Sequence, residues 1–141
     1  MIEDVVINKI TTIERCVNRI KEEYEKDITT FATDYTRQDA AILNIQRACE
    51  ASIDVGQYLI RRDKLGVPQS AREVFSILAE RHYIAPILAV HLQKMVSFRN
   101  IAVHDYKSLQ LPIIESIIKQ HLTDFLNYGQ QLLAFENARS S

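Results

Sequence analysis

Apolar residues recur every three or four positions along most of this chain, and no other feature constrains its fold as tightly. The first such run is Val6, Ile10, Ile13, Val17, Ile20 and Tyr24. This spacing places one apolar stripe along an α-helix. Only three Gly, three Pro and no Trp occur in 141 residues, which argues against a turn-rich all-β fold. The pattern therefore predicts an all-α protein.

The second apolar run predicts a long helix after a short irregular connection. Residues 27–37 are rich in Thr and Asp and predict a bend or a short helix. The second helix is expected from near Gln38 to Leu65. Gly66 lies just past its end, where a left-handed cap residue belongs, and Pro68 prevents the helix from continuing.

Three further helix starts are marked in the second half of the chain. Ser70 and Glu73 form a capping box, while Pro86 and Pro112 suit the first turn of a helix. The last predicted helix is expected to bury Ile114, Ile117, Ile118, His121, Leu122, Phe125 and Leu132. Helices with one apolar face pack against one another, so residues 1–141 predict a single domain, an antiparallel bundle of four to five helices.

The composition is ordinary for a protein that works in the cytoplasm. Apolar residues make up 47% and charged residues 25%. The acidic residues Glu3 and Asp4 interrupt any signal peptide, and no apolar stretch is long enough to cross a membrane. Cys16 and Cys49 lack CxxC spacing, so we expect reduced, structural thiols. Because the net charge is −1, a nucleic-acid ligand would need locally concentrated positive charge.

Chemically active side chains gather where the fourth predicted helix ends. Residues 99–106 read RNIAVHDY, or R-N-x3-H-x-Y, and contain Arg99, Asn100, His104 and Tyr106. A guanidinium binds a phosphate through two parallel hydrogen bonds, and an imidazole transfers protons near neutral pH. Metal-free cleavage of RNA needs both functions. The alternative is a polar helix end, with Arg99 capping carbonyls, His104 stabilised by the helix dipole and Tyr106 half-buried.

The five-residue spacing of Arg99 and His104 has a geometric consequence. On a straight helix these two side chains diverge by about 140°. Either the helix breaks before His104, or each site combines groups from two subunits. We favour a homodimer whose cleft is lined by both motifs, because one imidazole cannot easily lie on both sides of the reacting phosphorus.

The other histidines are weaker candidates. His82 fits a solvent-exposed turn, whereas His91 and His121 lie in apolar patterns that are typical of packed histidines. No Cys or carboxylate stands at metal-binding spacing around them, so we expect neither a metal site nor a cofactor.

A polar stripe on the second helix is formed by Asp54, Gln57 and Arg61. We interpret it as a solvated or ion-paired face. A role at the cleft stays open for Asp54 and for the Arg61-Arg62 pair, since basic residues at a helix end could track an RNA backbone.

Three segments carry a family resemblance: residues 45–54 (IQRACEASID), 65–75 (LGVPQSAREVF) and 95–106 (MVSFRNIAVHDY). By these segments the chain resembles the HEPN superfamily, and specifically the HepT-like toxins that are encoded beside a minimal nucleotidyltransferase antitoxin. The similarity covers about the whole chain. It departs at residues 81–83 (RHY), where the family often has a Gly-rich or acidic turn, and this affects only local details of that turn.

The resemblance implies a helical homodimer that acts as a metal-independent endoribonuclease on cellular RNA, tRNA or mRNA. It implies that Arg99 and His104 are the catalytic pair and that Asn100 is a supporting polar residue. It also implies that a cognate, MntA-like nucleotidyltransferase antitoxin transfers AMP to Tyr106 and so silences the toxin.

Two other functions fit the same residues. One is a non-catalytic helical subunit that binds a nucleotide or substrate for a partner nucleotidyltransferase, with Arg99 and His104 holding a phosphate without turnover. The other is a purely structural dimerisation module. Fold alone cannot separate these functions, but RNA fragments with cyclic phosphate ends would identify a nuclease.

Overall fold

Six α-helices and two short 3-10 helices form the computed structural model, which describes residues 1–140. The α-helices are α1 (Asp4–Glu25), α2 (Tyr35–Arg62), α3 (Ala71–Glu80), α4 (Pro86–His104), α5 (Leu111–Gln120) and α6 (Leu122–Ser140), and the 3-10 helices are η1 (Phe31–Thr33) and η2 (Tyr106–Ser108). No strand occurs in this range. The all-α prediction is confirmed, with one helix more than the expected four to five.

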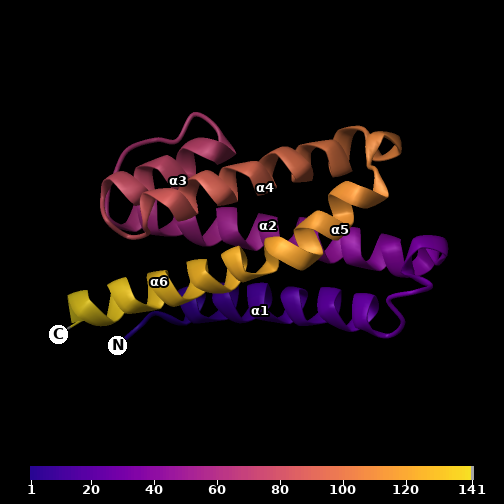
Figure 1. Cartoon of the computed structure of the whole chain (residues 1–141). Coiled ribbons are helices and arrows are strands. Elements are labelled where there is room, and N and C mark those ends of the chain that lie inside the picture. The colour runs from indigo at the N-terminus through magenta and orange to yellow at the C-terminus, as the bar shows by residue number, and fades with distance from the viewer. Residues whose placement is uncertain (141) are drawn as a thin grey trace.

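The helices close into an antiparallel bundle (Figure 1). Helices α1 and α2 form a long hairpin, and α3 and α4 form a second hairpin that packs on α2. Helix α6 lies along α1 and also contacts α2 and α4. Both chain termini lie at one end of the bundle, whereas the connection between α4 and α5 lies at the other. The R-N-x3-H-x-Y motif is therefore at the end of the bundle away from the termini.

A buried guanidinium fixes the connection between α1 and α2. Arg37 Nε donates to the carbonyl of Glu23 at 2.8 Å, and Nη2 donates to the carbonyls of Tyr24 (3.1 Å) and Asp27 (2.9 Å). The helix end would otherwise leave such carbonyls without a protein partner. Asp34 caps α2 by accepting the backbone N–H of Arg37 at 3.1 Å. The first turns of α2 are thereby anchored to α1.

The end of α2 differs from its prediction. Two residues after the helix have a positive φ: Lys64 (φ 55°) takes the cap position, and the expected Gly66 (φ 125°) follows two positions later. The N–H of Leu65 donates to the carbonyl of Ile60 at 3.0 Å, and the N–H of Lys64 donates to that of Arg61 at 3.3 Å. These two bonds define a Schellman motif, in which Leu65 also packs against the core. The paired backbone groups and this apolar contact offset the cost of a left-handed lysine.

The last predicted helix is divided into α5 and α6 at His121. The N–H of His121 donates to the carbonyl of Ile117 at 2.9 Å and completes α5, while Asp124 N–H donates to the His121 carbonyl at 3.1 Å. No proline or glycine marks this break, and the apolar spacing continues across it from Ile117 to Leu122. The predicted apolar residues of both halves are buried, and His121 is half-buried.

A glycine allows three helices to approach closely in the core. A Cβ added at Gly56 of α2 would lie 2.5 Å from Val74 Cγ1 on α3 and 3.0 Å from Tyr128 Oη on α6. Tyr128 is fully buried and donates its hydroxyl to the carbonyl of Ser52 at 2.8 Å. These contacts fix α2 against α3 and α6. Helix α2 also carries the hydrogen-bond partners of Arg99 and Tyr106, which are described below.

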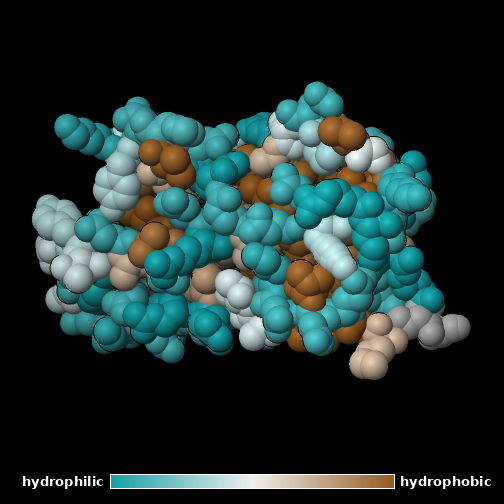
Figure 2. Space-filling view, turned by 180° about the vertical axis from the view of Figure 1, so that it is seen from behind, coloured by the Kyte–Doolittle hydropathy of each residue, from teal (hydrophilic) through white to brown (hydrophobic). Residues whose placement is uncertain are grey.

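The surface carries polar side chains with separate apolar patches between them, as the face in Figure 2 shows. Cys16 and Cys49 are both buried and free, as predicted for structural thiols. Within residues 1–140, no helix combines the length and the apolar character that a bilayer span requires.

Candidate active site

Three polar residues at the C-terminal end of helix α4, namely Arg99, Asn100 and His104, lie on two different sides of the helix. Its buried face is formed by Leu88, Ala89, Leu92, Met95, Val96, Phe98 and Ala102. At 100° per residue, Arg99 lies near the centre of this face, and its side chain is only 21% exposed. Asn100 and His104, four residues apart, share an exposed side of the helix.

Arg99 is paired with a carboxylate of α2. Its Nη1 donates to Glu50 Oε1 at 2.7 Å, while its Nε is buried and has no hydrogen-bond partner among the described residues. The alternative in which Arg99 caps helix carbonyls is therefore wrong. Glu50 holds Nη1 of the guanidinium, and because Nε is buried, Nη2 is the nitrogen left to bind a ligand.

His104 is the last residue of α4, and the helix does not break before it. The backbone N–H of Asp105 still donates to the carbonyl of Ile101 at 2.8 Å. This excludes the option in which a helix break brings Arg99 and His104 of one chain together. Within a single chain, Arg99 faces α2, and the exposed His104 lies about 140° away around the helix axis.

Tyr106 begins η2 immediately after α4 and is 47% exposed. Its hydroxyl donates a hydrogen bond to Asp39 Oδ1 on α2. Partial burial and the nearby Asp39 carboxylate raise the pKa of Tyr106 to about 12. The phenol is thus accessible and firmly protonated near neutral pH.

One further cation lies on the His104 side of α4. Arg72, in the first turn of α3, donates to Ser97 Oγ. Because Ser97 and His104 are seven residues apart, they lie on the same side of α4, two turns from each other. Arg72 thus adds local positive charge near that face.

Glu50, Asp39 and Arg72 were not singled out by the sequence analysis. Glu50 lies 49 residues before Arg99, and Asp39 lies 67 residues before Tyr106. Local periodicity carries no information on contacts at such separations. The antiparallel pairing of α2 with α4 brings Glu50 and Asp39 to their partners, and the packing of α3 on α4 places Arg72.

The polar stripe of α2 lies outside this group. Asp54 is ion-paired with Lys9 of α1 at 3.2 Å. Arg62 binds Glu3 and Glu136 near the chain termini, at 2.7 and 2.5 Å. The Arg61-Arg62 pair is thus at the end of the bundle opposite the motif, and a role for it in the same cleft is not supported.

The other histidines also lie apart from the motif. His82 is exposed, with a φ of 65° in the turn after α3. His91 and His121 place their Nδ1 atoms 3.2 and 3.0 Å from opposite oxygens of the buried Asp124. Residues 1–140 contain no convergence of three His, Cys, Asp or Glu side chains able to hold a metal ion.

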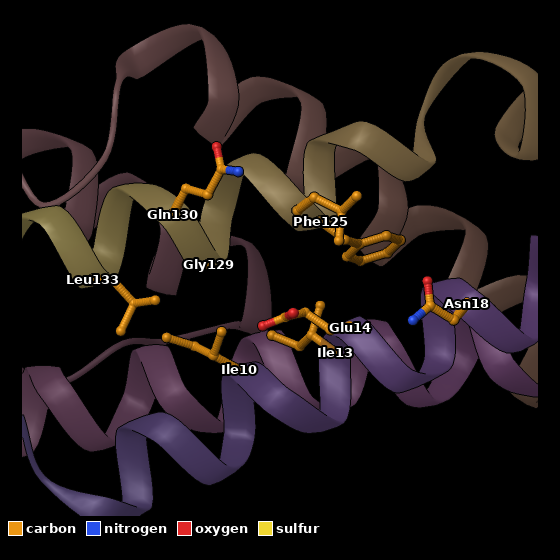
Figure 3. Close-up of a pocket in the computed structure, with 9 residues that line it drawn as sticks. Ile10, Ile13, Glu14, Asn18, Phe125, Gly129, Gln130 and Leu133 are labelled. Carbon is orange, nitrogen blue, oxygen red and sulfur yellow. The ribbon is translucent and has the colours of Figure 1, made fainter.

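Two surface grooves adjoin the bundle without containing the motif residues. A groove of about 290 Å³ lies between α1 and α6, with Ile10 and Phe125 on its apolar walls and Glu14 and Asn18 beside them (Figure 3). A second groove of about 410 Å³ lies between α4 and α5 and is lined by Phe98, Ile101, Pro112 and Ile113 among others. The candidate site is therefore an exposed helix end rather than an enclosed pocket.

Comparison with known proteins identifies the family of the chain. A family model described as ribonuclease HepT-like matches residues 13–132. A protein of Shewanella oneidensis described as mRNA nuclease HepT is 48% identical over 122 residues, which cover 86% of this chain and 91% of the relative. A solved structure of a tri-AMPylated Shewanella oneidensis HEPN toxin in complex with MNT antitoxin is 45% identical, with a TM-score of 0.90 over 94% of this chain and 99% of the other. A toxin–antitoxin structure with AMP-PNP is 45% identical, with a TM-score of 0.89 over the same shares of both chains. The chain belongs to the ribonuclease HepT-like family.

Proposed function

We propose that this single-domain protein is an endoribonuclease toxin of the cytoplasm that cleaves cellular RNA through Arg99, Asn100 and His104. In this proposal no metal ion takes part. The observation that carries it is the arrangement at the end of α4, where an imidazole and an amide are exposed on one side of the helix, an anchored guanidinium lies on another side, and an accessible phenol follows the helix. The relative described as an mRNA nuclease supports an RNA substrate.

The reaction follows from what these groups can do. A neutral His104 imidazole removes the proton of a ribose 2′-OH, and the oxygen attacks the adjacent phosphorus to form a 2′,3′-cyclic phosphate. The departing 5′-oxygen takes a proton from a second, protonated imidazole. Arg99 stabilises the charge of the phosphorane, and Asn100 orients a reacting group. Proton transfer by a positioned side chain contributes about 10²–10⁴-fold to such a reaction.

A homodimer supplies the groups that one chain cannot bring together. Since α4 is continuous, Arg99 and His104 of one chain face different directions. Two-fold symmetry duplicates every group and lets an imidazole from each protomer face one phosphate. Exposed apolar side chains flank the motif, namely Leu43, Ile101, Val103 and Ile113. They offer a surface that a second copy would cover.

Tyr106 is the proposed acceptor of AMP from a minimal nucleotidyltransferase antitoxin. The modified tyrosine would carry a bulky phosphodiester with a negative charge two residues from His104. It would block an RNA phosphate both sterically and electrostatically. The tri-AMPylated toxin structure and the AMP-PNP complex support this mode of control.

The cleavage proposal is tested with purified protein, total RNA and a chelator. We expect fragments with cyclic phosphate ends from the wild type and none from His104→Ala. The matched control is His82→Asn in the turn between α3 and α4, because asparagine tolerates the positive φ there. Binding of RNA without cleavage would instead identify a non-catalytic binding subunit.

The acceptor is tested by mass spectrometry after incubation with the partner enzyme and ATP. We expect one or more AMP units on Tyr106 and loss of RNA cleavage. A Tyr106→Phe protein that is still modified and silenced would exclude this residue.

A further inference from the structure

The phenol of Tyr106 is already paired with a potential base. Its hydroxyl donates to Asp39 Oδ1, and this is the only hydrogen bond of the Asp39 side chain found within residues 1–140. Asp39 is exposed and belongs to the second turn of α2. A hydrogen bond at the surface therefore joins the acceptor atom of the proposed modification to an ionisable carboxylate.

We infer that Asp39 is the general base that removes the phenol proton of Tyr106 during AMP transfer. The inference rests on the proposed function, in which Tyr106 is the acceptor. A phenol is a weak nucleophile while it keeps its proton, and burial together with Asp39 raises the pKa of Tyr106 to about 12. Spontaneous ionisation at neutral pH is therefore rare, and the reaction needs a positioned base.

The step balances with the groups named. The phenol oxygen forms a bond to the α-phosphorus of ATP, the bond from that phosphorus to the bridging oxygen of the β-phosphate breaks, and pyrophosphate leaves. The phenol proton passes to the Asp39 carboxylate and then to water. ATP is bound and supplied by the partner nucleotidyltransferase, so this chain contributes only the nucleophile and its base.

Asp39 is well placed because its helix is held from several sides. Asp34 caps the start of α2, and the Arg37 guanidinium ties it to the end of α1. A base on an anchored helix keeps its geometry when an enzyme docks, and this preorganisation is where general bases gain their effect.

The AMP-modified Tyr106 cannot keep its hydrogen bond to Asp39. After transfer the Tyr106 oxygen has no proton to donate, and the new phosphodiester places a negative charge against a carboxylate. The modified side chain therefore leaves Asp39. Hence the base acts once per phenol and does not hold the product.

The test replaces Asp39 with asparagine, which still accepts the hydroxyl hydrogen bond but cannot take up the proton. Initial rates of AMP incorporation are measured with the purified partner enzyme while either ATP or this chain is varied. We expect kcat to fall by roughly 10²-fold or more, with both KM values within about twofold of wild type. Asp39→Glu should recover part of kcat. The charge-matched control is Asp54→Asn on the same helix, which should react like wild type.

A pH series separates a base from a structural role. The Asp39→Asn rate should rise about tenfold per pH unit above neutrality, because the phenol must then ionise unaided. The wild-type rate should stay nearly flat there. Thermal unfolding of each variant verifies that the fold is intact.

Each outcome bears on one claim. Wild-type kcat in Asp39→Asn, or a change in KM alone, overturns the role of Asp39. If Tyr106→Phe is modified at the wild-type rate, or if the wild-type chain is not modified, Tyr106 is not the acceptor and Asp39 is not its base. If the wild-type chain is modified at Tyr106 but never cleaves RNA, the proposed ribonuclease activity is wrong, while the role of Asp39 as the base is unaffected.

Discussion

Replacing Arg99 with methionine should abolish RNA cleavage while leaving the fold as stable as before or more stable. The reason is the cost of placing a guanidinium on the buried face of α4. Among the residues that the structure describes, its Nε is buried without a hydrogen-bond partner, and its Nη1 is paired with a Glu50 carboxylate that is 44% exposed.

The expected change in the free energy of unfolding follows from these two features of Arg99. An unpaired buried N–H costs about 1–3 kcal/mol, whereas an ion pair with a partly exposed partner contributes about 0–1 kcal/mol. Methionine keeps an apolar stem of similar length that fits irregular spaces. The free energy of unfolding of Arg99→Met should therefore equal that of wild type or exceed it by up to about 2 kcal/mol. In a chain of this size that raises Tm by up to roughly 6–8 °C.

The assay is thermal unfolding by circular dichroism, at one fixed protein concentration because the Tm of the proposed dimer would depend on concentration. RNA cleavage is measured on the same samples. Glu50→Gln is the contrasting variant, because it removes the counter-ion of Arg99 and should lower the free energy of unfolding by up to about 1 kcal/mol. An Arg99→Met protein destabilised by more than about 2 kcal/mol would refute the reasoning and make Arg99 a structural residue.

Three further changes probe the site and the bundle. Arg99→Lys keeps the charge but loses the planar fork, so cleavage should fall at least about tenfold in a fluorogenic RNA assay. Gly56→Ala forces a Cβ against Val74 and should lower the free energy of unfolding in urea by about 1–3 kcal/mol. Hydrogen bonds, above all from Arg62, lower the pKa of Asp63. The ionised carboxylate therefore stabilises the fold fully above about pH 4, and this stabilisation becomes smaller as the pH falls further. Asp63→Asn should therefore be less stable than wild type at pH 7 by urea unfolding, and the difference should shrink by pH 3.

Local chemistry allowed the helix starts to be predicted. Ser70 Oγ accepts the backbone N–H of Glu73 at 3.2 Å, as the capping box required. Pro86 and Pro112 both stand in the first turn of a helix. These signals act over three or four residues, so they remain readable without knowledge of the fold.

Tertiary contacts decided what local signals could not. Lys64 took the cap position ahead of Gly66, which also has a positive φ, because Leu65 packs on the core behind it. The break at His121 keeps the apolar period intact, so periodicity could not reveal it. Likewise, the chemical types of Arg99 and Tyr106 drew attention to them, but their carboxylate partners lie on α2.

The central claim is that one RNA cleft takes its groups from two chains, and subunit mixing tests it most directly. Wild-type and His104→Ala chains are co-expressed in equal amounts, and the cleavage rate is measured per wild-type chain. If each cleft needs both imidazoles, only unmixed wild-type dimers are active and the rate falls to about half of the undiluted value. An unchanged rate per wild-type chain would mean that one imidazole is enough for each cleft, which contradicts a cleft that needs the His104 side chains of both protomers.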